Sequence, residues 1–227
     1  MTSKAVVLLS GGLDSTTVGA VARSTGADLY ALTIDYNQRH RVELDAAQRV
    51  AKWLGVRQHV VLPIDLRVFG GSSLTAELTV PKDVEMETIG KNIPNTYVPA
   101  RNTVFLSLAL AYAESVAAQE IYIGISSVDY SGYPDCRPEF LSAFETLANR
   151  ATRAGVEQPG YFTIKAPLLY LTKKEVIVLG RSLGVDYSLT RTCYDPDENG
   201  RSCGRCESCL LRIKGFQEVG IPDPIPY

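Results

Sequence analysis

The stretch "VVLLSGGLDSTTVGAV" at residues 6–21 joins an unbroken apolar run to two glycines and a hydroxyl-rich helical pattern. The apolar run is typical of a buried parallel strand, and a helix is expected from about Ser15 to Arg23. Two glycines let the backbone approach a ligand closely, and the unpaired N–H groups at the start of a helix attract an anion. The turn is therefore expected either to bind phosphate or to be a tight strand-to-helix connection capped by serine.

Short apolar strands alternate with amphipathic helices along the rest of the chain, which predicts a doubly wound α/β fold with a mainly parallel sheet. The length of 227 residues suits a single domain, residues 1–227, without internal repeats. The expected strands are 4–9, 28–34, 58–64, 120–125 and 161–166, and the expected helices are 15–23, 42–54, 103–117, 139–154, 173–183 and 208–218. Residues 66–100 and 126–138 are rich in turn residues and are expected to be irregular, the first as a long functional loop.

The composition is that of an ordinary globular protein, with 45% hydrophobic and 21% charged residues and a formal net charge of −2. Lysine and arginine are spread along the chain, which argues against a nucleic-acid partner and favours a small molecule. The apolar stretches are shorter than the roughly 18 to 20 residues that cross a bilayer, and the apolar start is too short for a signal peptide. We therefore expect a cytoplasmic protein without membrane contact.

Four of the five cysteines, Cys193, Cys203, Cys206 and Cys209, follow the spacing C-x9-C-x2-C-x2-C in the tail at 190–227. Four thiolates at this spacing can close a tetrahedral Zn²⁺ site, and a site closed by four protein ligands is structural. A disulfide pair and an iron–sulfur cluster are the alternatives, the first disfavoured by a reducing cytosol. Cys136 lies outside the spacing and is expected to have no chemical role.

The segment "SGGLDS", residues 10–15, matches the S-G-G-x-D-S pattern of the PP-loop ATP pyrophosphatases. That resemblance implies that the turn binds ATP with Mg²⁺ and that ATP is cleaved to AMP and pyrophosphate. Further segments look like the 7-cyano-7-deazaguanine synthase family, and the resemblance spans nearly the whole chain. They are "DYNQRH" 35–40, "VPARN" 98–102, "DYSGYPDCRPEF" 129–140, "APLLYLTKKE" 166–175 and the four-cysteine tail.

The resemblance implies an ATP-dependent carbon–nitrogen ligase of queuosine precursor biosynthesis, working as a homodimer. Its substrates would be ATP, ammonia and 7-carboxy-7-deazaguanine, and its product the nitrile, formed through an adenylated carboxylate and an adenylated amide. Adenylation is needed because oxide is a very poor leaving group, whereas AMP leaves readily. Two other functions stay open: a PP-loop ligase that stops at the amide or uses another acceptor, and a zinc-ribbon RNA-binding protein with a vestigial loop.

The same resemblance assigns roles to individual side chains, carried over to the matching positions of this sequence. The catalytic residues would be Asp14, Arg101 and Lys173; the nucleotide-binding residues Leu9, Ser10, Gly11, Gly12, Leu13, Asp14, Ser15, Thr16, Thr17, Ile34 and Tyr36; and the substrate-binding residues Arg101, Tyr133, Asp135, Arg137 and Phe140. Each group also has structural alternatives, such as a surface ion pair for Arg101, a solvated Lys173 and core packing for Tyr133 or Phe140.

The sequence has two histidines, and it departs from the family pattern at two positions. His40 is a candidate base or orienting group, while His59 opens an apolar strand and is expected to be structural. The chain has Ala100 where the family commonly has glycine before the arginine, and Lys165 where it usually has an uncharged residue. These departures leave the implied reaction intact and bear on the detail of the loop.

Overall fold

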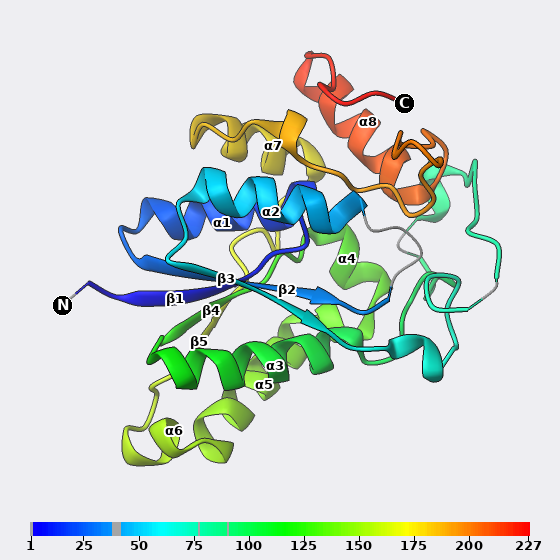
Figure 1. The fold of residues 1–227 in the computed structure, drawn as a ribbon. Coiled ribbons are helices and arrows are strands. Elements are labelled where there is room, and N and C mark those ends of the chain that lie inside the picture. Colours follow the sequence, from blue (N-terminus) through cyan, green and yellow to red (C-terminus); the bar gives the residue numbers. More distant parts are fainter. Residues whose placement is uncertain (1, 38–41, 77, 90) are drawn as a thin grey trace.

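The computed structural model describes residues 2–37, 42–76, 78–89 and 91–227, and its centre is a five-stranded parallel sheet (Figure 1). The strands are β1 (Lys4–Leu8), β2 (Asp28–Asp35), β3 (Gln58–Pro63), β4 (Glu120–Tyr122) and β5 (Thr163–Lys165). The helices are α1 (Leu13–Ser24), α2 (Val42–Leu54), α3 (Arg101–Val116), α4 (Ser127–Gly132), α5 (Pro138–Ala151), α6 (Arg153–Glu157), α7 (Lys173–Ser182) and α8 (Glu207–Val219). Single 3₁₀ turns lie at Leu66–Val68, Met86–Thr88, Pro134–Cys136 and Tyr187–Leu189.

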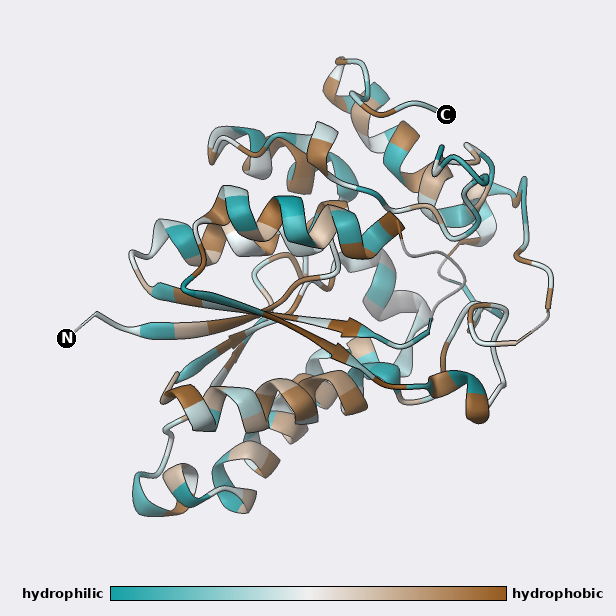
Figure 2. Cartoon of the chain, in the orientation of Figure 1, coloured by the Kyte–Doolittle hydropathy of each residue, from teal (hydrophilic) through white to brown (hydrophobic). Residues whose placement is uncertain are grey.

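The central strand β1 is buried on both faces, as its unbroken apolar sequence predicts. Val6 and Leu8 pack into the cluster that includes α3 and α5, while Ala5 and Val7 pack into the cluster of α1 and α7. Neighbouring side chains of a strand point to opposite faces, so each face needs its own apolar cover. The strands are accordingly mostly brown in Figure 2, and teal residues lie on the outer surfaces of the helices.

Helices cover both faces of the sheet, which confirms the predicted doubly wound class. α1, α2 and α7 lie on one face and α3 and α5 on the other, while α8 packs against α7 (Figure 1). Within the described residues, no helix combines the length and the hydropathy needed to span a membrane.

In the strand order β3-β2-β1-β4-β5, the strands that follow β1 are added first on one side of it and then, from β4 onward, on the other side. The chain runs outward from β1 through β2 to β3 and then returns along α3 to place β4 on the other side of β1. At such a reversal the connections leave the carboxyl ends of the two central strands in opposite directions, and a crevice opens between them. The turn at residues 10–15 follows β1 and lies at this crevice.

Most expected elements are confirmed within a few residues, and in the long loop 66–100 the described residues, which leave out 77 and 90, form two single 3₁₀ turns. The expectation for 126–138 is wrong, because this stretch contains α4. The Ser126 backbone N–H and hydroxyl each donate to Asp129 Oδ2, both at 2.8 Å, and this capping box offsets the glycine and tyrosine content that suggested a loop. The helix expected at 139–154 is divided between α5 and α6 by the extended Thr152, whose hydroxyl accepts from Gly155 N.

A buried ion pair holds the C-terminal segment against α8. The Arg212 side chain is 2% exposed and its Nε lies 2.7 Å from Asp223 Oδ2. The same guanidinium donates to Thr190 Oγ1 at 2.7 Å and to the carbonyl of Tyr187 at 3.2 Å. Arg212 therefore ties the chain end to the segment that leads into the cysteine tail.

We expect Asp223→Ala to lower the free energy of unfolding by about 3 to 5 kcal/mol, because Arg212 would keep a buried charge without its counter-ion. Glu218→Ala is the matched control, since Glu218 is 42% exposed and 3.7 Å from Lys214 on the same helix. It should change stability by less than about 0.5 kcal/mol. Denaturant unfolding followed by circular dichroism measures both, and equal losses in the two variants would contradict this account.

Candidate nucleotide and metal sites

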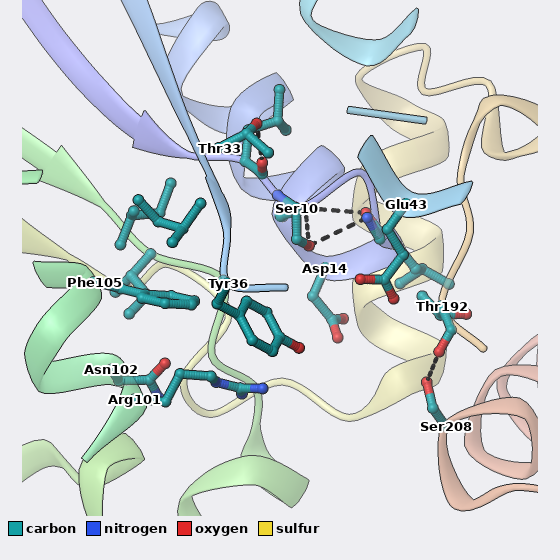
Figure 3. A pocket seen from close by; sticks show the side chains of 18 of the residues that line it. Ser10, Asp14, Thr33, Tyr36, Glu43, Arg101, Asn102, Phe105, Thr192 and Ser208 are labelled. Carbon is teal, nitrogen blue, oxygen red and sulfur yellow. Dashed lines mark hydrogen bonds between the residues drawn. The ribbon is translucent and has the colours of Figure 1, made fainter. Parts of the chain in front are cut away.

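A cavity of about 240 Å³ lies at the carboxyl ends of β1, β2 and β4. Figure 3 shows side chains from the turn after β1, the end of β2 and the starts of α2 and α3 facing this space. Polar and charged groups share its wall with apolar strand ends. The lining includes Leu9, Ser10, Gly12, Leu13, Asp14, Ser15, Leu32, Ile34, Tyr36, Glu43, Arg101, Phe105, Gly124, Asp129, Arg191, Thr192, Cys193 and Tyr194.

The turn at 10–15 needs glycine at its second position for two reasons. Gly11 has φ +81°, which side chains rarely adopt, and a Cβ there would lie 2.4 Å from the backbone nitrogen of Ala47. Its carbonyl accepts from Arg191 N at 2.9 Å, so the tail also packs on this turn. The side chain of Ser10 accepts from Gly12 N at 3.3 Å and lies 3.0 Å from Ser15 Oγ.

A third glycine brings β4 against the same turn. Gly124 follows β4 in the chain, and a Cβ at this position would lie 2.9 Å from the backbone nitrogen of Ser15. A contact below 3.0 Å with backbone cannot be relieved by a side-chain rotation. The start of α1 is thus held between the ends of β1 and β4, with its first N–H groups at the cavity.

Most of the expected nucleotide-binding residues line the cavity, and the other three support the turn. Those that line the cavity are Leu9, Ser10, Gly12, Leu13, Asp14, Ser15, Ile34 and Tyr36. Thr16 and Thr17 are fully buried, and their hydroxyls donate to the carbonyls of Gly12 and Leu13 at 2.7 and 2.9 Å. The Thr17 hydroxyl also lies 2.8 Å from Tyr187 Oη. These two threonines therefore anchor α1 in the core, while Gly11 shapes the turn.

Lys173 is the first residue of α7, and its ammonium lies 2.8 and 2.7 Å from the two carboxylate oxygens of Asp14. The two side chains are 13% and 23% exposed. Burial alone would lower the pKa of Lys173, but the negative charges of Asp14 and Asp129 outweigh it and raise that pKa. The sequence-based alternative of a solvated lysine is therefore wrong, and Lys173 contacts the turn through Asp14.

Arg101 lies across the cavity from the turn, at the start of α3. Its guanidinium carbon lies 5.9 Å from the ring centre of Phe105, and Figure 3 shows the side chain beside Tyr36. The preceding residue, Ala100, has φ +53° and ψ +24°, which is a left-handed conformation that suits glycine. The backbone at this position therefore suits glycine, the residue that the family resemblance leads one to expect there.

A second cavity of about 80 Å³ adjoins the first, and Arg101, Gly124, Asp129 and Tyr194 line both. Tyr133 contributes to its wall, as its assignment to substrate binding would require. The Tyr133 hydroxyl lies 3.1 Å from Thr96 Oγ1.

The other residues expected to bind substrate lie elsewhere. Asp135 is 6% exposed, and its Oδ2 accepts from the backbone of Asn102 at 2.9 Å, so it caps the first turn of α3 next to Arg101. Arg137 is exposed before α5, and Phe140 packs against Phe144 with ring centres 6.2 Å apart. We infer that this segment positions Arg101 through α3.

Several lining residues were missed by the sequence analysis. Asp129 is half-buried near Lys173, and the loss of solvent around it raises its pKa. Glu43 on α2 lines the main cavity, and its burial raises its pKa to about 7. The capping box at Ser126 and Asp129 was readable from the sequence, but for Glu43 the only signal is its place in the first turn of a helix. His40 lies outside the described residues, and His59 Nε2 is 2.8 Å from Thr33 Oγ1 between neighbouring strands.

The four cysteines of the tail form one cluster, with all their sulfurs within 4.8 Å of one another. Around a single ion with bonds of about 2.3 Å, tetrahedral thiolates stand about 3.8 Å apart, and Cys203 Sγ and Cys209 Sγ are separated by 4.0 Å. Backbone N–H groups of Cys203 and Cys206 point at Cys193 Sγ and Cys203 Sγ, at 3.2 and 3.3 Å. Hydrogen bonds from the Cys193 and Cys209 thiols lower the pKa of Cys206. The cluster can therefore hold a metal ion.

The remaining cysteine is separate from this cluster. Cys136 is 4% exposed, and its sulfur accepts from Asn102 Nδ2 at 3.1 Å. All five cysteines are free thiols in this structure.

The glycine turn at the change of strand order and the cavity beside it are those of a doubly wound α/β protein with a ligand crevice at the carboxyl ends of its strands. Two solved structures have related folds. The first is the NMN synthetase from Francisella tularensis, which has a TM-score of 0.51 and 16% sequence identity; the match covers 97% of this chain and 78% of that one. A predicted subunit of tRNA methyltransferase from Methanocaldococcus jannaschii has a TM-score of 0.51, 17% identity and coverage of 99% and 92%. At these identities the likeness concerns the fold alone.

The chain belongs to the family described as "Queuosine biosynthesis protein QueC", whose model matches residues 4–220. Curated relatives from Geobacter sulfurreducens and Kineococcus radiotolerans are each 59% identical over 227 residues. The matches cover all of this chain and 94% and 99% of the relatives, both of which are named 7-cyano-7-deazaguanine synthase.

We expect Gly11→Ala to abolish binding of adenine nucleotides and to destabilise the fold by about 3 kcal/mol or more, because it adds a backbone clash to an unfavourable φ. Gly26→Ala is the matched control: its φ is +78°, and an added Cβ meets nothing within 4 Å. The control should lose only about 1 to 2 kcal/mol and keep its affinity. Thermal unfolding and nucleotide titration measure both effects, and preserved nucleotide affinity in Gly11→Ala would contradict this role of the turn.

Proposed function

We propose that this chain is an ATP-dependent ligase that converts 7-carboxy-7-deazaguanine and ammonia to 7-cyano-7-deazaguanine. The observation that carries the proposal is that one cavity is lined both by the glycine turn at residues 10–15 and, on the opposite wall, by Arg101. A nucleotide and an anionic acid can then meet in the same space. The names of the relatives supply the product, 7-cyano-7-deazaguanine, and the family resemblance supplies the acid.

The turn and α1 would hold the phosphates of ATP through backbone N–H groups and the hydroxyls of Ser10 and Ser15. The adenine would lie near the end of β2, between Leu32 and Tyr36. Lys173 would offset the charge that grows on departing pyrophosphate, and Arg101 would orient the acid through its planar guanidinium. Mg²⁺ would accompany ATP, with Asp14 as the carboxylate nearest the phosphates.

The reaction would pass through two adenylations. In the first, a carboxylate oxygen bonds to the α-phosphorus of ATP, pyrophosphate leaves, and ammonia then displaces AMP to give the amide. In the second, the amide oxygen is adenylated and AMP leaves as the nitrile forms. The chain's own contribution is to hold the reacting oxygen and phosphorus together and to exclude water.

We expect purified protein with ATP, Mg²⁺, ammonium and 7-carboxy-7-deazaguanine to yield the nitrile together with AMP and pyrophosphate. Mass spectrometry identifies the deazaguanine product, and chromatography identifies the nucleotide. The amide as the final product would show a ligase that stops early, and ADP as the nucleotide product would contradict the PP-loop mechanism. Turnover that requires RNA would favour the zinc-ribbon RNA-binding alternative.

We infer that the metal of the cysteine cluster is Zn²⁺ with a structural role, because four thiolates close its coordination. Zinc would cross-link the tail that supplies Thr192 and Tyr194 to the cavity wall. The homodimer stays a prediction of the family resemblance, and the cytoplasmic location stays a prediction from the short apolar stretches of the sequence.

One zinc ion per chain is expected by elemental analysis, and Cys193→Ser should lose both the metal and thermal stability, since a closed thiolate site binds the folded tail only. Cys136→Ser is the control and should keep its zinc. Iron with inorganic sulfide, or zinc retained by Cys193→Ser, would show that the zinc assignment is wrong.

A further inference from the structure

A carboxylate that the proposed function has not used, Glu43, faces the main cavity. Glu43 is the second residue of α2, and the backbone of that helix start packs directly against the turn: a Cβ on Gly11 would lie 2.7 Å from the Glu43 carbonyl oxygen. The position of Glu43 beside the turn is therefore set by backbone packing. Figure 3 shows its carboxylate pointing into the space that Asp14, Tyr36 and Arg101 also face.

The surroundings of Glu43 leave its carboxylate able to exchange a proton. Burial is the largest influence and raises the pKa to about 7; Arg101 lowers it and Cys206 raises it. The charged and titratable groups that share the cavity wall come from several elements. They are Asp14 from α1, Tyr36 from β2, Arg101 from α3, Asp129 from α4, and Arg191, Cys193 and Tyr194 from the tail.

The second half of the proposed reaction requires a proton acceptor. When the amide oxygen bonds to the α-phosphorus and pyrophosphate leaves, the amide nitrogen loses one proton and becomes an imidate nitrogen. When the C–O bond to AMP breaks, the remaining N–H electron pair forms the third C–N bond and the second proton leaves. The second proton leaves from a neutral imidate N–H, which is a far weaker acid than ammonium, so this half depends more on a positioned base than the first.

We propose that Glu43 is the catalytic base that takes the nitrogen-bound protons during dehydration of the amide to the nitrile. Among the described acidic residues that line the cavity, Asp14 is ion-paired with Lys173, and Asp129 Oδ2 accepts two hydrogen bonds from Ser126. Glu43 faces the same space from the opposite side of the turn. The inference rests on the proposed function, and it assigns a residue to one stage of that reaction.

The test starts from the synthetic amide, 7-amido-7-deazaguanine, with ATP and Mg²⁺, because this assay needs no ammonia and its pH profile is free of ammonium titration. Wild-type nitrile formation should fall as the pH drops below about 7, since the carboxylate form is the active one. Glu43→Gln should slow the reaction by about 10² to 10⁴ and lose this acid limb. With the carboxylic acid and ammonium as substrates, the same variant should accumulate amide.

Asp45→Asn is the matched control, because Asp45 lies in the same first turn of α2 but is exposed. It should keep the wild-type rate and pH profile. Glu43→Asp should retain the acid limb at a reduced rate, which separates the chemical role from a loss of folding in Glu43→Gln. Nucleotide affinity should stay within a few-fold of wild type in both Glu43 variants.

Three results would overturn the assignment. The first is a rate of nitrile formation in Glu43→Gln equal to that of Asp45→Asn, and the second is a Glu43→Gln rate that still falls at low pH as in the wild type. The third is full recovery of the Glu43→Gln rate at high Mg²⁺, which would identify Glu43 as a metal ligand. A wild-type protein that adenylates the acid but leaves the amide unchanged would instead contradict the nitrile as product, and so the proposed function itself.

Discussion

The architecture depends on the close approach of three backbone segments to the turn at 10–15. Gly11 meets the start of α2, Gly124 meets the start of α1, and the carbonyl of Gly11 accepts from Arg191 of the tail. The first two contacts leave no room for a side chain, and in the third the Gly11 carbonyl accepts a hydrogen bond from the Arg191 backbone N–H. The result is a rigid cradle in which the unpaired N–H groups of α1 face the cavity, so that phosphate binding costs little reorganisation.

The charged side chain of Asp14 next to the turn is paired with an opposite charge. Lys173 lies between Asp14 and Asp129, and the pKa of Lys173 is raised although burial alone would lower it. Neutralising Asp14 in this way keeps the turn receptive to an anion. On the opposite wall Arg101 is held by α3, whose first turn is capped by Asp135. Arg101 thus faces the cavity, and Lys173 pairs with the cavity-lining Asp14 from an element far away in the sequence.

The cysteine tail contributes to the site as well as to stability. Thr192, Cys193 and Tyr194 line the cavity, and Gly12 would place a Cβ only 3.3 Å from the Thr192 methyl group. The loop 66–100 also reaches the cluster, since Lys82 pairs with Asp195 at 2.8 Å and Val80 packs among the cysteines. The buried Arg212 ties this region to the C-terminal segment. The cysteine cluster and the cavity wall therefore share one segment of the tail.

The amino-acid sequence by itself determined the parallel sheet, the phosphate-type turn and the four-cysteine cluster, because each is written in local patterns: apolar runs, a glycine pair and a fixed cysteine spacing. It also contained the signals for Arg101 and Lys173. Only the tertiary structure decided which side chains reach the cavity, since reach depends on packing between distant segments. It turned Asp135 toward α3, placed Thr17 against Tyr187 and brought Glu43 beside Gly11, and it raised the pKa of Glu43 by burying a side chain whose sequence context is that of an ordinary helix start.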